Sequence, residues 1–162
     1  MAQMSGTTPT APLASAYEAL RPTILDRLLE LRATLDPSLG RLDEATARSQ
    51  IGAVIEHLGN FIATGDLGLH RAFLHTFLAM RAAEAQSPAS VLAMLVSIGD
   101  TAAQVAQEQG AGTTEGAELT LLLTRVTAST ARVVNDLIAD ELGRRLAQHH
   151  ELLGGTREGA PT

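Results

Sequence analysis

Apolar residues recur every three or four positions through almost the whole interior of this chain, and this spacing constrains the fold more than any other feature. It is the period of an amphipathic α-helix, and no run alternates between apolar and polar residues as a half-buried strand does. The 162 residues include 27 Ala and 25 Leu, which favour helices, against 3 Phe, 1 Tyr and no Trp. We therefore predict an all-α protein, a globin-like or helical-bundle domain of five to six helices with a long C-terminal helix.

The length of the chain fits one domain. Small, polar and proline-containing residues at 1–12 predict a disordered lead-in, and residues 154–162 predict a disordered tail, which leaves 13–153 as a single helical domain. The start of the chain lacks the basic residues and apolar run of a secretory signal. The longest apolar stretch, Val91 to Ile98, is far shorter than a membrane span of about 20 residues. We expect a cytoplasmic location.

Capping and helix-breaking residues divide the domain into five main helices. Asp43 and Ser87 are good N-caps, and Pro88 suits a first helical position. Pro22 lies inside the first helix, where we expect a kink or a short break. The predicted helices span about 13–35, 43–65, 66–86, 88–109 and 114–153.

Two glycines lie on one flank of the second predicted helix, and each costs about 1 kcal/mol relative to alanine in a helix. These residues, Gly52 and Gly59, therefore predict that another element packs closely against that flank. The fourth helix is apolar over more than half its circumference, so we expect it to be the most buried element.

The last helix changes its apolar face along its length. In its first half, the core stripe includes Leu119, Leu123 and Val126, but beyond Ile138 this direction carries charged residues. Either this helix rolls over to meet the first helix, or it emerges as a stalk that dimerises or joins a downstream domain. The dimer or stalk candidates are Ile138, Leu142, Leu146, His149 and Leu153.

Composition excludes several function classes. All 12 basic residues are arginines, so Schiff-base and phosphate-loop lysines are absent, and the lack of cysteine excludes thiol catalysis. A net charge of −6 argues against a nucleic-acid binder. The chain contains no Glu-x-x-His pair, no His-Glu-x-x-His and no Gly-x-Ser-x-Gly. We therefore predict no enzyme activity, no catalytic residue, no cofactor and no metal site.

Histidines and aromatic residues converge on the predicted core between the second, third and fourth helices. His70 and Arg81 lie within the apolar arc of the third helix. Either each caps a neighbouring helix end or sits in a subunit interface, or one of them lines a ligand pocket with Phe73 and Phe77. His75, His149 and His150 fall on solvated faces. The candidates for lining a small-molecule pocket are His57, Phe61, His70, Phe73, Phe77 and Met94.

Residues 57–100 resemble the N-terminal sensory domains of RsbR-type stressosome proteins, which are described as non-haem globins. The likeness lies in a helix that ends at Gly65-Asp66, a helix that carries Arg71 and Arg81, and Ser87-Pro88 before an apolar helix. The long terminal helix matches the signalling helix of that family in position, so the resemblance extends over about 17–153.

The resemblance implies a bacterial, homodimeric sensory or scaffold domain for stress signalling, in which the C-terminal helix passes the signal to a partner or a STAS domain. No STAS segment follows Leu153 in this sequence, so we expect an isolated domain or a stand-alone relative. The alternatives are a histidine phosphotransfer-type bundle that uses His75, a haem-binding globin-like sensor, or a helical enzyme of the chorismate-mutase kind. The missing lysine disfavours the first and the last of these.

Overall fold

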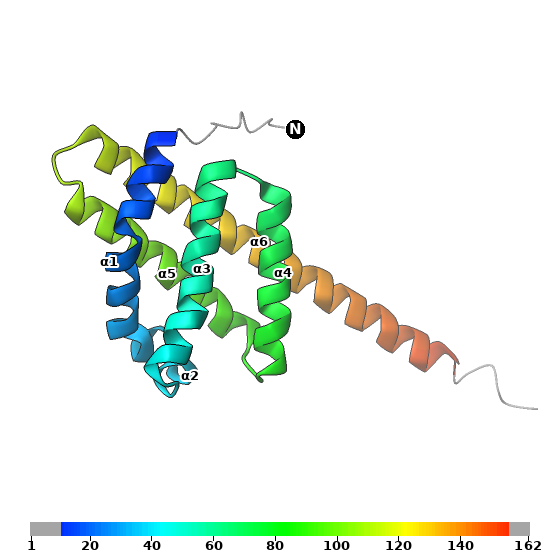
Figure 1. Cartoon of the computed structure of the whole chain (residues 1–162). Helices are drawn as coiled ribbons and strands as arrows, with labels where there is room; N and C mark the ends of the chain where they lie inside the picture. The colour runs from blue at the N-terminus through cyan, green and yellow to red at the C-terminus, as the bar shows by residue number, and fades with distance from the viewer. Residues whose placement is uncertain (1–10, 156–162) are drawn as a thin grey trace, which may run out of the picture.

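The computed structural model describes residues 11–155, and these residues form six α-helices and no strand. This confirms the all-α prediction with a long C-terminal helix. In Figure 1, α1 to α5 form a bundle, and α6 passes along it and extends beyond α4. The helices are α1 (Ala11–Leu35), α2 (Pro37–Gly40), α3 (Glu44–Thr64), α4 (Leu67–Ala83), α5 (Pro88–Gln109) and α6 (Thr114–Gly155).

The predicted capping residues begin and end the helices as expected. The Asp43 and Ser87 side chains accept hydrogen bonds from backbone N–H groups in the first turns of α3 and α5, and Gly65 ends α3 in the left-handed conformation at φ 65°. The third predicted helix was too long, because α4 ends at Ala83 and Ala85 adopts a φ of 60° that stops a helix.

One additional helix and two domain boundaries differ from the sequence prediction. The short helix α2 was not among the five main predicted helices, and Asp36 caps it through the backbone N–H of Ser38. Helix α1 starts two residues before the predicted domain boundary, and α6 ends two residues after it. The remainder of the predicted lead-in and tail, 1–10 and 156–162, lies outside the described residues.

Helix α1 continues without a break through Pro22, so the predicted stripe belongs to one element. Tyr17 before the proline and Ile24 and Leu28 after it are all fully buried. Burial of apolar side chains on both sides compensates for the one backbone hydrogen bond that a proline removes.

Helix α5 is the central element of the fold, because α1 and α6 both pack against it. Ten of its residues are buried, more than in α1, α3 or α4. By length and composition α5 is long and apolar enough to cross a membrane, yet half of its most apolar segment is buried inside the bundle. A buried core helix can be equally long and apolar, so this single helix is weak evidence for a membrane span.

The two glycines of α3 behave differently. A methyl group on Gly59 would lie 3.0 Å from the Tyr17 ring, and the Tyr17 hydroxyl donates a 2.8 Å hydrogen bond to the Ile55 carbonyl, so α1 does pack closely there. Burial raises the pKa of Tyr17. The prediction is wrong for Gly52, which has nothing within 4 Å of such a methyl group.

The first half of helix α6 packs in the core, and its second half extends away from the bundle. Leu119, Leu123 and Val134 are buried, whereas every residue from Leu142 to Leu153 is exposed. The alternative in which this segment rolls onto α1 therefore does not occur. We refer to residues 139–153 as the α6 stalk (Figure 1).

Candidate functional site

A hydrogen-bonded chain of three polar side chains, two of them buried and one half-buried, connects three helices in the middle of the bundle. The Nε2 atom of His57 on α3 lies 2.9 Å from Nδ1 of His70 on α4, and His70 Nε2 lies 3.0 Å from the Thr130 hydroxyl on α6. The periodicity of each helix directs these three side chains inward, so one polar chain sets the rotation of three helices relative to one another.

With both histidines neutral, the hydrogen bonds between His57, His70 and Thr130 can run in either of two directions. His57 N–H donates to His70 while His70 N–H donates to Thr130, or the Thr130 hydroxyl donates to His70 while His70 N–H donates to His57. Only 3% of His70 is exposed. Burial lowers the pKa of His70 to about 4, with a smaller contribution from the neighbouring His57, and burial also lowers the pKa of His57.

One phenylalanine ring stacks on each of the two histidines. The His57 ring stacks on Phe73 with centroids 3.8 Å apart, and the His70 ring stacks on Phe61 at 4.2 Å. Phe77 continues the stack beyond Phe73 at 5.8 Å. This packing fixes the planes of the imidazole rings as well as their polar edges.

The space beside the histidines is small. A cavity of about 30 Å³ lies between His57, His70, Phe73 and Thr130 and the core of α5. Pockets for drug-sized ligands are usually about 300–1,000 Å³, and a water molecule occupies about 30 Å³ of liquid. A porphyrin does not fit this space, so the haem-binding alternative does not fit these residues.

A second buried polar cluster centres on Arg81 at the end of α4. Its Nη1 donates to Gln50 Oε1 at 2.7 Å and to Glu84 Oε2 at 2.8 Å, and its Nη2 lies 3.8 Å from the Asp36 carboxylate. Arg81 and Asp36 are each 4% exposed, and Gln86 donates a 2.7 Å hydrogen bond to Asp36. Arg81 thus connects α4 to α3 and to the junction of α1 and α2 through side-chain contacts within the bundle, which differs from the helix-end cap or subunit interface expected from the sequence.

The six predicted pocket residues lie together, but around two small spaces rather than one pocket. His57, His70 and Phe73 line the cavity of about 30 Å³. Phe77 and Met94 line a neighbouring space of about 10 Å³ beside Arg81, while Phe61 covers His70. Thr130, whose hydroxyl lies 3.0 Å from His70 Nε2, was not among the candidate site residues that the sequence indicated.

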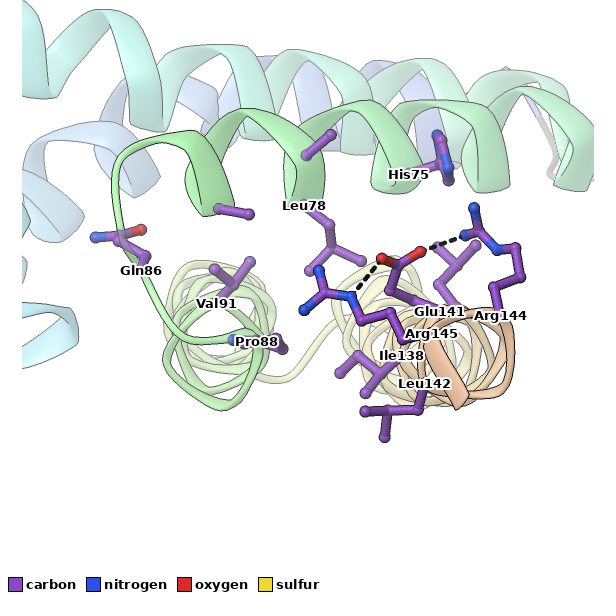
Figure 2. A pocket seen from close by; sticks show the side chains of 13 residues that line it. His75, Leu78, Gln86, Pro88, Val91, Ile138, Glu141, Leu142, Arg144 and Arg145 are labelled. Carbon is purple, nitrogen blue, oxygen red and sulfur yellow. Dashed lines mark hydrogen bonds and ion pairs between the residues drawn. The ribbon is translucent and has the colours of Figure 1, made fainter. Parts of the chain in front are cut away.

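A larger groove lies where the α6 stalk leaves the bundle. Its volume is about 190 Å³, and its floor includes Leu78, Val91 and Ile138 (Figure 2). Glu141 pairs with both Arg144 and Arg145 at 2.7 Å on the rim, and the two arginines lower the pKa of Glu141.

The remaining histidines are exposed. His75 lies on the rim of this groove, and His149 and His150 lie on the stalk. No group of three or more potential ligands that could hold a metal ion occurs within residues 11–155.

No known protein family, curated protein or solved structure matches this chain. The resemblance to RsbR-type sensory domains therefore stays a prediction.

The buried histidine predicts a pH-dependent stability. An unfolded histidine has a pKa of about 6.5, whereas that of His70 is about 4 in the fold, so the unfolded state binds more protons between these values. The free energy of unfolding should be highest above pH 6.5 and fall as the pH drops toward 4, by up to about 3 kcal/mol.

Urea unfolding followed by circular dichroism at a series of pH values measures this slope. His70→Gln keeps a neutral donor and acceptor but cannot titrate, so it should make the slope between pH 6.5 and 4 shallower, and His57 with its lowered pKa should account for a remaining slope. His150→Gln, on the exposed stalk, is the control and should leave the slope unchanged. An equally steep slope in His70→Gln would show that other groups cause the pH dependence.

Proposed function

We propose that this chain is a non-catalytic, homodimeric sensory or scaffold domain of cytoplasmic signalling, similar to the N-terminal domain of RsbR-type stressosome proteins. The helical bundle is the sensory part. The α6 stalk is the output element, and it passes the signal to a second copy and to a partner protein or a downstream STAS-type domain.

The observation that carries this proposal is the exposed leucine line of the stalk. Leu142 is 57% exposed and Leu146 is 60% exposed, and both continue a helix whose first half is core. A helix end that served only its own bundle would present polar residues to water. Exposed leucines at helical spacing favour packing against another helix.

The polar chain and one surface ion pair connect the bundle to this output element. His70 of α4 contacts Thr130 in the buried half of α6, and Arg71 pairs with Asp140 at the base of the stalk at 3.0 Å. These contacts on α6 are ten residues apart, about 15 Å along the helix axis. A shift of α4 would therefore turn or translate α6, which is a known kind of switching motion.

Arginines in the leucine line test the role of the stalk. Leu142→Arg with Leu146→Arg should halve the mass of the assembly in size-exclusion chromatography with light scattering, because buried arginines disfavour a helix–helix contact. Circular dichroism should show the helical content of the wild type, since both leucines are exposed.

Leu121→Arg is the matched control, because Leu121 is a 51% exposed leucine in the first half of the same helix. It should leave the mass unchanged. An unchanged mass in the double variant would remove self-association from the functions of the stalk.

A further inference from the structure

The exposed surface of α4 is almost free of charge. Eleven residues of this helix are exposed, and Arg71 is the single charged residue among them. Its guanidinium pairs with Asp140 on α6, so the charge is directed toward the stalk and away from the rest of the face. The exposed residues of α4 are Leu67, Gly68, Leu69, Arg71, Ala72, His75, Thr76, Ala79, Met80, Ala82 and Ala83.

The other long helices of the bundle expose charged residues in the ordinary way. Exposed carboxylates include Glu18 and Glu30 on α1, Glu56 on α3, and Asp100 and Glu108 on α5. A helix on the surface of a soluble protein normally carries such residues on its solvent side. The outer face of α4 shares two features with the centre of a protein interface, the depletion of charged residues and an exposed methionine, while its four alanines give it small side chains.

Five of these exposed residues form one stripe with symmetric spacing. Leu69, Ala72, Thr76, Met80 and Ala83 follow each other at steps of three, four, four and three, so they share one face of the helix. The spacing is the same when it is read in either direction from Thr76. The stripe is about 21 Å long at 1.5 Å per residue.

We propose that this stripe packs against the same stripe of a second copy of the chain, with the two α4 helices antiparallel around a twofold axis at Thr76. The axis would place Leu69 opposite Ala83 of the other copy, and Met80 opposite Ala72. Each large side chain then meets a small one, and the two Thr76 side chains meet at the centre. A twofold contact needs such a self-complementary surface.

We choose a second copy of the chain as the partner that packs on this stripe for two reasons. The stripe is self-complementary, and a stable dimer needs a larger contact area than the stalk alone offers. The stalk offers four apolar or histidine positions over two heptads, Leu142, Leu146, His149 and Leu153. A stable interface usually buries about 800 Å² on each partner, or about 20–30 residues a side. The α4 stripe supplies additional neutral surface, and the inference rests on the homodimer proposed above.

Charges of opposite sign at Thr76 test this contact. Thr76→Arg and Thr76→Glu should each halve the mass of the assembly, because like charges meet at the axis. An equimolar mixture of the two variants should recover the wild-type mass, because the twofold axis then brings an arginine to a glutamate. Thr124→Arg, at an exposed threonine of α6, is the matched control and should keep the wild-type mass.

The outcomes separate this inference from the proposed function. A wild-type mass in both Thr76 variants, with a halved mass in the stalk double variant, overturns the α4 contact and leaves the stalk dimer. If both Thr76 variants have a halved mass and their mixture does not recover the wild-type mass, the antiparallel packing around a twofold axis at Thr76 is overturned. A wild-type chain that is monomeric at every concentration overturns the homodimer and the α4 contact together.

Discussion

Replacing Arg81 with leucine is expected to lower the free energy of unfolding by about 3 kcal/mol, since removal of one partner from a buried ion pair typically costs about 3–5 kcal/mol. Arg81 and Asp36 are each 4% exposed, so Arg81→Leu leaves a buried carboxylate without its cation. The variant also removes the 2.7 Å hydrogen bond to Gln50 and the contact of the guanidinium with the Phe77 ring.

Urea denaturation at a fixed protein concentration measures this loss. Arg81→Leu combined with Asp36→Asn removes both charges, and the amide side chain of the second substitution keeps an oxygen that can accept from the Ser38 backbone. The double variant should therefore recover part of the lost stability. A double variant that is less stable than Arg81→Leu alone would mean that Asp36 acts through its cap on α2 and not through the ion pair.

Gly99→Ala and Gly52→Ala are expected to change stability in opposite directions. Alanine is favoured over glycine in a helix by about 1 kcal/mol. At Gly99 the new methyl group would overlap the Thr127 hydroxyl oxygen and lie 2.9 Å from the Thr127 Cβ, so α5 and α6 would have to separate. We expect a net loss of about 2 kcal/mol, because overpacking typically costs about 1–3 kcal/mol.

At Gly52 the same substitution has nothing within 4 Å, so the helix preference should appear as a gain of up to about 1 kcal/mol. Thermal and urea unfolding of the two variants measure the expected loss of stability in Gly99→Ala and the expected gain in Gly52→Ala. A gain in stability for Gly99→Ala would contradict the close approach of α5 and α6 at Thr127.

Local sequence signals predicted the elements of this fold well wherever a capping residue marked an end. Ser87 and Pro88 placed the start of α5, and Asp43 and Gly65 placed the ends of α3. These residues act on the backbone within a few positions, so their effect can be derived from neighbouring residues alone. The end of α4 was less predictable, because Ala85 adopts a left-handed φ without being glycine.

The candidate site was predictable in its members and not in its geometry. Helical periodicity directed His57, His70 and Phe73 to a common core, and the structure places their rings in one stack. Periodicity did not predict that His70 would contact Thr130, because those residues are 60 positions apart in the chain. It also gave no measure of the remaining volume, which depends on how side chains of four helices interlock.

Residue order was enough to predict the all-α class, most of the helix ends, and the change of apolar face near Ile138, because each depends on local propensity and on the helical period. Packing in three dimensions was needed to establish that Gly59 and not Gly52 meets α1, that Arg81 pairs with Asp36, and that the stalk leaves the bundle. It also showed that the neutral stripe of α4 is exposed. These features depend on which helices lie side by side and in what rotation, and that arrangement is a property of the whole packed core.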